Sequence, residues 1–110
     1  MRIWDIDPVH LCDQHLLGEH RELHAIWSIL TTEKQGYAQH PETRRWRGRL
    51  AALYARHGEQ VNEMRSRGFR HLSPLNPRLA TGVAQQSELV DPIDAQRARL
   101  TARACGCRVG

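Results

Sequence analysis

The chain has 110 residues, with 16 Lys and Arg against 12 Asp and Glu, so its formal net charge is +4 at pH 7. This length suits one domain with a single hydrophobic core, and no stretch approaches the roughly 20 apolar residues of a membrane-spanning helix. We therefore expect one domain over residues 1–110 that does not enter a membrane. Every basic residue except Lys34 is Arg. Arg binds phosphate through paired hydrogen bonds, so the charge suits an anionic partner, although a GC-rich genome would produce the same bias.

The start of the sequence does not look like a secretory signal, because Asp5 and Asp7 follow Arg2 with no apolar run behind them. The three cysteines are an odd number, which favours reduced thiols over a disulfide framework. These features predict a cytoplasmic protein, and we expect a monomer.

The first helix is predicted around residues 13–30. It could open at Asp7-Pro8, since Asp caps free backbone N–H groups and Pro fits the first helical position. Alternatively it begins at Asp13, after a turn over residues 8–12. Apolar residues recur at helical spacing and form one stripe: Cys12, Leu16, Leu23, Trp27 and Leu30. We expect the three tryptophans, Trp4, Trp27 and Trp46, to anchor the core.

Ionisable residues follow one edge of that stripe. His15, Glu19 and Glu22 lie roughly a quarter-turn from it at ~100° per residue, whereas Arg21 projects nearly opposite. Glu22 is therefore expected where the core meets the surface. Two interpretations stay open: Glu19 and Glu22 are solvated helix carboxylates, as such residues usually are, or Glu22 is a functional acid with a raised pKa.

A second helix is predicted to begin at His40-Pro41-Glu42 and to end at Gly68. Its apolar stripe consists of Trp46, Leu50, Leu53, Tyr54, Val61 and Met64. Five arginines surround its first half: Arg44, Arg45, Arg47, Arg49 and Arg56. They form either a solvated face or a surface that contacts phosphates, and composition alone does not decide between the two.

Residues 69–90 contain Pro74, Pro77 and Gly82 and predict a long connection, part of it mobile. Asp91-Pro92 then opens a third, short helix whose apolar positions are Ile93, Leu100 and Ala104. Residues 72–110 are thus expected to be the least regular part of the domain. About three helices without a strand pattern predict a single compact all-α domain.

A zinc site is the one metal site that the sequence suggests. His20 and His24 have a one-turn ligand spacing, and Cys105 and Cys107 could complete four ligands. However, the Cys-x-Cys pair follows the His pair at a long distance, unlike the usual finger patterns. We therefore expect no metal site at these residues, and the sequence implies no metal or organic cofactor elsewhere.

At Asp13-Gln14-His15-Leu16, Glu19 and Arg21-Glu22-Leu23 the chain resembles the pyrimidine dimer DNA glycosylases of the phage endonuclease V type. A weaker second match is Arg67-Gly68-Phe69, which closes the second helix, so the resemblance extends from residue 1 to Phe69. It implies a compact all-α domain whose N-terminal segment packs between two long helices.

The resemblance also implies an activity, namely excision of a damaged base followed by cleavage of the DNA backbone. The nucleophile would be the α-amine of Met1, which attacks the sugar C1′ and forms an imine. Glu22 would be the essential acid. Arg2 and Arg21 would contact the DNA near the lesion, and His15 would support the site. With Arg44, Arg45 and Arg47 as further contacts, the expected partner is double-stranded DNA with damaged bases, a cyclobutane pyrimidine dimer being the leading substrate.

The sequence departs from the family in four places. Met1 stands where the family has a small residue, and Arg2 should prevent its removal, so we expect a retained, deformylated Met1. Ala25 replaces an arginine that contacts DNA. The stretch between the first two helices is shorter, and residues 105–110 do not match the family's aromatic, basic tail. Three alternatives remain open: a glycosylase for a different damaged base, a non-catalytic helical nucleic-acid-binding protein, and a small helical interaction module.

Overall fold

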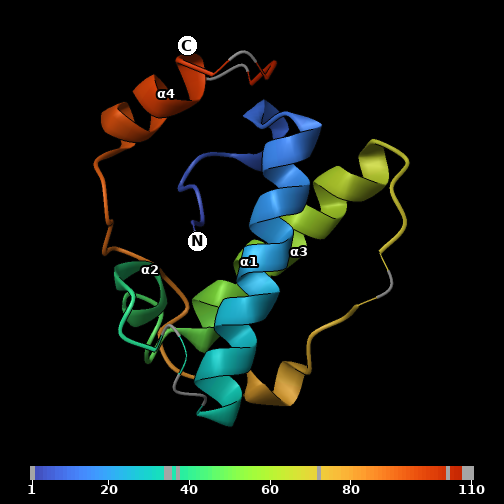
Figure 1. Cartoon of the computed structure of the whole chain (residues 1–110). Helices are drawn as coiled ribbons and strands as arrows, with labels where there is room; N and C mark the ends of the chain where they lie inside the picture. The colour runs from blue at the N-terminus through green and yellow to red at the C-terminus, as the bar shows by residue number, and fades with distance from the viewer. Residues whose placement is uncertain (1, 34–35, 37, 72, 104, 108–110) are drawn as a thin grey trace.

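The computed structural model describes residues 2–33, 36, 38–71, 73–103 and 105–107. These residues form four α-helices and two short 3-10 helices, with no strand among them, which confirms the predicted all-α class (Figure 1). The elements in chain order are η1 (Pro8–His10), α1 (Asp13–Thr32), α2 (Pro41–Arg44), α3 (Leu50–Ser66), η2 (Pro77–Leu79) and α4 (Ile93–Thr101). Within the described residues, no helix combines the length and apolar character needed to cross a bilayer.

The first helix begins at Asp13, so the second of the two predicted starts is the correct one. The Asp7 side chain caps η1 instead, by accepting a hydrogen bond from the Val9 N–H, and Pro8 takes the first helical position there. Cys12 is the N-cap residue of α1, but its side chain makes no capping hydrogen bond. The Cys12 thiol is therefore free to face elsewhere.

The prediction of one continuous second helix is wrong, because the stretch is divided into α2 and α3. Gly48 has a φ of +71°, a left-handed conformation that cannot continue an α-helix. The break serves a tertiary contact, since the Gly48 carbonyl accepts a hydrogen bond of 2.8 Å from the Val83 N–H. Gly82 passes so close to Gly48 that a Cβ at residue 82 would collide with its backbone. The predicted end at Gly68 is confirmed, with a φ of +83°.

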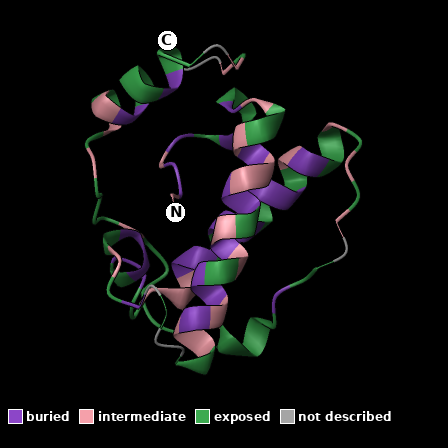
Figure 2. Cartoon of the chain, viewed as in Figure 1, coloured by how far each residue is buried: buried purple, intermediate pink, exposed green. Residues whose placement is uncertain are grey.

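The main core lies where α1 crosses α3, and buried residues concentrate on the facing sides of these two helices (Figures 1 and 2). Leu23, Ile26 and Leu53 are completely buried there. Trp4, Trp27 and Trp46 are all buried, as predicted for the core anchors. A second apolar cluster, around the start of α1 and the end of α3, includes Leu16, Met64 and Leu100.

The segment before η1 runs between α1 and α3, as expected. The Trp4 N–H donates to a Glu19 carboxylate oxygen on α1 at 2.7 Å, and the Ile6 carbonyl accepts from Arg56 on α3 at 2.9 Å. The side chains of Ile3 and Ile6 belong to the first and second apolar clusters respectively. The segment is thus held by hydrogen bonds and by burial on both sides.

The long connection after α3 returns along the molecule and caps the start of that helix. Free N–H groups of the first turn of α3 donate to it, Ala51 to the Thr81 carbonyl at 2.8 Å and Ala52 to the Val83 carbonyl at 3.2 Å. The chain then leads to α4 (Figure 1). Leu100 of this helix is completely buried. Ala104, the last apolar position predicted for this helix, lies outside the described residues.

Candidate active site

Glu19 is the most buried carboxylate of α1, and its side chain has no solvent exposure. It accepts hydrogen bonds from the Trp4 N–H at 2.7 Å, from the Arg56 Nε and Nη2 at 2.9 Å each, and from the Gln60 amide. The interpretation of Glu19 as a solvated helix carboxylate is therefore wrong. Paired hydrogen bonds between a guanidinium and a carboxylate are strong and fix the relative orientation of both groups.

Arg56 stays charged in this buried network. Burial by itself would lower the pKa of its guanidinium, but the charge and hydrogen bonds of Glu19 outweigh that effect and raise the pKa. The fully bonded ion pair fixes α1 to α3, and the Glu19 Oε1 that accepts from the Arg56 Nη2 also accepts from the Trp4 N–H. Glu19 thus positions the N-terminal segment.

The N-terminal segment has a definite direction along α1. Ile6 packs in the cluster that contains Leu16, and Trp4 bonds to Glu19. Ile3 packs in the cluster that contains Leu23, nearer the C-terminal end of the helix. From residue 6 back to residue 3, the segment therefore moves along α1 toward the level of Glu22.

Glu22 lies one helical turn beyond Glu19 and is half-buried, in agreement with its expected place at the border of core and surface. Arg21 is exposed on the same helix. Met1, the predicted nucleophile, lies outside the described residues. Arg2, the first described residue, bonds to Asp91 at 2.8 Å, and its guanidinium lies over the Trp4 ring, 4.9 Å from the centroid.

His15 lies one turn before Glu19, at the start of α1. Its ring packs edge-on against Trp4 with a centroid distance of 5.8 Å, and its Nδ1 faces the thiols of Cys12, Cys105 and Cys107. Burial, and then the positive charge of Arg103, lower the pKa of the imidazole. The structure therefore brings His15 together with cysteines from the end of the chain.

The five arginines of the second predicted helix divide into an outer and an inner set. Arg44 and Arg47 are exposed, although Arg47 donates to the Ala38 carbonyl at 3.2 Å. Arg45 is buried, and its guanidinium bonds inward to Glu42, Asp5, the Ile3 carbonyl and the Glu88 carbonyl. Arg49 bonds to Glu88, and Arg56 to Glu19. Only Arg44 and Arg47 of this group face solvent broadly.

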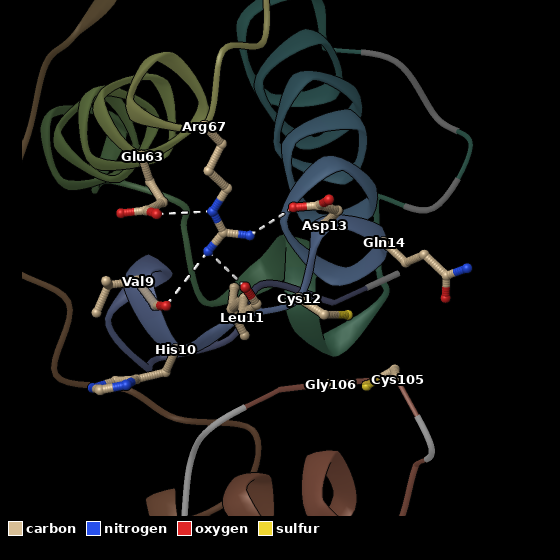
Figure 3. Close-up of a pocket in the computed structure, with 10 residues that line it drawn as sticks. All are labelled: Val9, His10, Leu11, Cys12, Asp13, Gln14, Glu63, Arg67, Cys105 and Gly106. Carbon is tan, nitrogen blue, oxygen red and sulfur yellow. Dashed lines mark hydrogen bonds and ion pairs between the residues drawn. The ribbon is translucent and has the colours of Figure 1, made fainter.

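Arg67, from the second stretch of resemblance, links the end of α3 to the start of α1. Its guanidinium bonds to Glu63 and Asp13 and donates to the carbonyl of Leu11 at 2.7 Å (Figure 3). These groups line a pocket of about 590 Å³ that also contains Cys12 and Cys105. Arg67 therefore has a structural role, which is to link the end of α3 to the start of α1.

Four histidines from α1, α3 and the connection form a second group of possible metal ligands: His20, His24, His57 and His71. Burial lowers the pKa of His57 to about 4, helped by the charges of the neighbouring histidines, and burial also lowers the pKa values of His20 and His24. The combination of His20 and His24 with Cys105 and Cys107, which the sequence suggested, does not form. The two histidines lie with His57 and His71, and the two cysteines lie with Cys12 and His15.

Sequence reasoning missed His57 and Gln60 as parts of the site, and it expected Arg56 to face solvent or phosphates instead of Glu19. They occupy the positions on α3 between Leu53 and Met64 that a helical repeat directs to the core. Polar residues at such positions must find partners when buried, and this was the available signal. Their partners on α1 lie too far away in the sequence to be read from spacing.

Comparison with known proteins identifies a family. A family model described as pyrimidine dimer DNA glycosylase matches residues 1–76, which include α1, α2 and α3. No curated protein and no solved structure matches the chain. The match covers the N-terminal segment and Glu22, and ends before α4.

Proposed function

The chain belongs to the pyrimidine dimer DNA glycosylase family, and on this premise we propose that it excises a damaged pyrimidine and then cleaves the DNA strand by an imine mechanism. The observation that carries the proposal is the bond between the Trp4 N–H and Glu19. It ties the N-terminal segment to α1, and from Ile6 to Ile3 this segment runs toward the level of Glu22.

The proposed nucleophile is the α-amine of Met1. An α-amine has an unperturbed pKa near ~8, so a useful fraction is neutral and nucleophilic at cellular pH. The amine attacks C1′ of the damaged nucleotide, and the bond from C1′ to the base breaks, with its electron pair leaving on the base. Opening of the sugar ring gives an imine at C1′. Removal of a C2′ proton then expels the 3′ phosphate and cuts the strand.

Glu22 is proposed as the acid that assists these steps. A carboxylate beside the sugar stabilises the positive charge that develops at C1′ and can transfer protons during imine formation and elimination. Its half-buried position on α1 supports this role, since the side chain is reachable from solvent yet borders the core. Glu19 is committed to Arg56 and Gln60, which leaves Glu22 as the carboxylate of this edge for chemistry.

Borohydride trapping on duplex DNA tests the proposal. We expect a covalent adduct on abasic-site DNA and on UV-irradiated DNA, located at the Met1 amine by mass spectrometry of the crosslinked peptide. Glu22→Gln should lose base excision and keep most of its DNA affinity, while the exposed Glu59→Gln on α3 should behave as wild type.

The outcomes separate the alternatives. An adduct on abasic DNA alone would support the proposed lyase activity and indicate that the substrate is a damaged base other than a pyrimidine dimer. No adduct on either DNA would leave a non-catalytic DNA-binding protein. An active Glu22→Gln variant would overturn the role of Glu22, and full cleavage by an N-terminally acetylated protein would overturn that of Met1.

DNA binding is proposed to use the exposed arginines Arg21, Arg44 and Arg47, with Arg2 nearer the lesion. Each phosphate contact releases condensed counterions, so the slope of log K against log salt falls by about 0.9 per contact on duplex DNA. Arg44→Ala with Arg47→Ala should therefore reduce the slope by about 2. Arg97→Ala, an exposed control on α4, should leave the slope unchanged; an unchanged slope in the double variant would remove both residues from the interface.

A further inference from the structure

A group of soft ligands lies at the first turn of α1, away from Glu22. Cys12, His15, Cys105 and Cys107 each offer one ligand atom, and these four atoms lie within 4.8 Å of one another. The His15 Nδ1 is 3.1 Å from the Cys12 Sγ, 3.4 Å from the Cys105 Sγ and 3.3 Å from the Cys107 Sγ. The Sγ atoms of Cys105 and Cys107 are 3.5 Å apart, and all three cysteines are free thiols.

These separations fit a tetrahedral metal site. Zinc binds sulfur at about 2.3 Å and imidazole nitrogen at about 2.0–2.1 Å, so tetrahedral geometry places sulfur and nitrogen about 3.5 Å apart and two sulfurs about 3.8 Å apart. The observed contacts lie slightly inside these values. Three cysteines with one histidine are also a donor set of structural zinc sites. We propose that Cys12, His15, Cys105 and Cys107 bind one zinc ion.

The local structure explains how four residues from two ends of the chain converge. Cys12 and His15 lie three residues apart at the start of α1, where i and i+3 share a face. Gly106 has a φ of +92°, a conformation that glycine adopts without strain, and it turns the chain between Cys105 and Cys107. In Figure 3, Cys105 and Gly106 lie across the pocket from Cys12.

A backbone contact supports the ligand role of Cys107. The Cys12 N–H points to the Cys107 Sγ at 3.1 Å, and such outer contacts orient and stabilise a thiolate ligand. The zinc ion would fasten the C-terminal segment to the start of α1. It would also hold the His15 ring against Trp4, next to the N-terminal segment. His15 is then a metal ligand, and its contribution to the active site is positional.

Zinc content and cobalt spectra test this site in the full chain. Protein produced with zinc and purified without chelators should lose one zinc per chain in Cys105→Ser with Cys107→Ser, and keep its full content in the exposed control His10→Gln. Replacement by Co²⁺ should give the near-ultraviolet thiolate-to-cobalt charge-transfer band in wild type and remove it in the double variant. A double variant with the wild-type zinc content would overturn the proposal.

Thiol alkylation of the unmodified protein gives a test that does not depend on the fold of a variant. In the zinc-loaded protein all three cysteines should react slowly, and removal of zinc by a chelator should expose them together. Rapid alkylation of Cys12, Cys105 and Cys107 in zinc-saturated protein would equally contradict the site. Neither experiment measures base excision, so failure of the proposed function would leave these results standing.

Independent observations point to a second metal site, at His20, His24, His57 and His71. Their ligand atoms also lie within 4.8 Å of one another, and the Nε2 atoms of His20 and His24 are 3.2 Å apart. Two nitrogens bound tetrahedrally to one ion at about 2.0–2.1 Å would be about 3.3 Å apart. The Nε2 atoms of His57 and His71 are buried without a hydrogen-bond partner, so an ion would satisfy two otherwise unpaired polar atoms.

The surroundings of His20 fit a ligand. Its Nδ1 bonds to the Gln60 Oε1 at 2.9 Å, which fixes the hydrogen on Nδ1 and leaves the Nε2 lone pair directed at the cluster. Gln60 in turn donates to Glu19. Metal-bound histidines commonly have such an outer partner. We infer that the four histidines bind a divalent first-row ion, and that Gln60 links it to the carboxylate that holds Trp4.

The variant Cys105→Ser with Cys107→Ser isolates this second site. In that background, Zn²⁺ titrated against a competing chelator should bind at one equivalent, and Co²⁺ should give d–d bands without a thiolate band. His71→Gln, a change in the connection outside α1 and α3, should weaken binding at least tenfold. No binding in the background protein, or an unchanged affinity in His71→Gln, would show that the buried nitrogens serve no metal.

Discussion

Residues 2–76 and residues 77–107 differ in how they are held in the fold. The first part contains nearly all of the apolar core, built where α1 crosses α3. In the second part, Leu100 is the one buried apolar residue among those the structure describes. Its other attachments are mainly hydrogen bonds. Some hold the N-terminal segment, namely Gln96 to Asp5 and Asp91 to Arg2, while others hold the α2–α3 region, such as the bond of the Glu88 carbonyl to Arg45.

This difference suggests that the first part supplies most of the stability of the fold, while the second part mainly positions other segments. Apolar burial is non-directional and supplies most of the free energy of folding, whereas hydrogen bonds add less but fix geometry. The second part of the chain should therefore contribute little to the stability of the α1–α3 core. It should matter for the placement of the N-terminal segment, and the family match ends where this second part begins.

The largest effect is expected from Glu19→Gln, inside the first part. The change removes the charge that balances Arg56 and leaves a buried guanidinium uncompensated, which typically costs about 3–5 kcal/mol. Urea denaturation should show this as a lower midpoint. Glu59→Gln is the matched control, since Glu59 is exposed and lies 3.9 Å from the same guanidinium. Equal losses in the two variants would mean that Arg56 does not depend on the buried pair.

The next test compares two leucines that are both completely buried, Leu53 on α3 and Leu100 on α4. Leu→Ala in a core costs about 2–5 kcal/mol. We expect Leu53→Ala to lower the free energy of global unfolding, and Leu100→Ala to loosen α4 alone. Hydrogen exchange should then show faster exchange of α4 amides with unchanged protection of α3. Faster exchange of α3 in Leu100→Ala would show that the two parts unfold together.

The sequence predicted the parts that follow from local rules. The helical repeat located α1 and the tryptophan core, and Gly68 ended α3, because these features depend on residues near in sequence. The break before α3 could not be predicted, since Gly48 takes its positive φ together with a contact to Val83. Isolated glycines inside a helical pattern are often tolerated, so the pattern alone favoured a continuous helix.

The candidate site shows the same limit. Glu22 and Arg21 could be placed from α1 alone, while the burial of Glu19 depended on Arg56 from another helix. The ligand types for metal sites were visible as well. Sequence spacing could not show that His20 and His24 lie with His57 and His71 instead of with Cys105 and Cys107. The tertiary fold decides which residues that are distant in sequence come together.

The smallest effect is expected from Asp91→Asn, which removes one polar attachment between the two parts. The hydrogen bond from Arg2 lowers the pKa of Asp91, with help from the charge of Arg99. A lowered carboxyl pKa means that the ion pair stabilises the fold above the unfolded pKa of about 3.9, and that this contribution disappears as pH falls through the folded value. Melting temperatures of the two proteins should differ slightly at neutral pH and converge in acid.

The same variant also separates attachment from DNA binding. Asp91→Asn frees the Arg2 guanidinium from its carboxylate, so affinity for damaged duplex DNA should be retained or increased, whereas Arg2→Gln should reduce it. Binding measured at fixed salt on one UV-irradiated duplex compares the variants directly. A loss of affinity in Asp91→Asn would mean that the ion pair holds Arg2 in its DNA-binding position, and that the second part of the chain shapes the DNA interface through this contact.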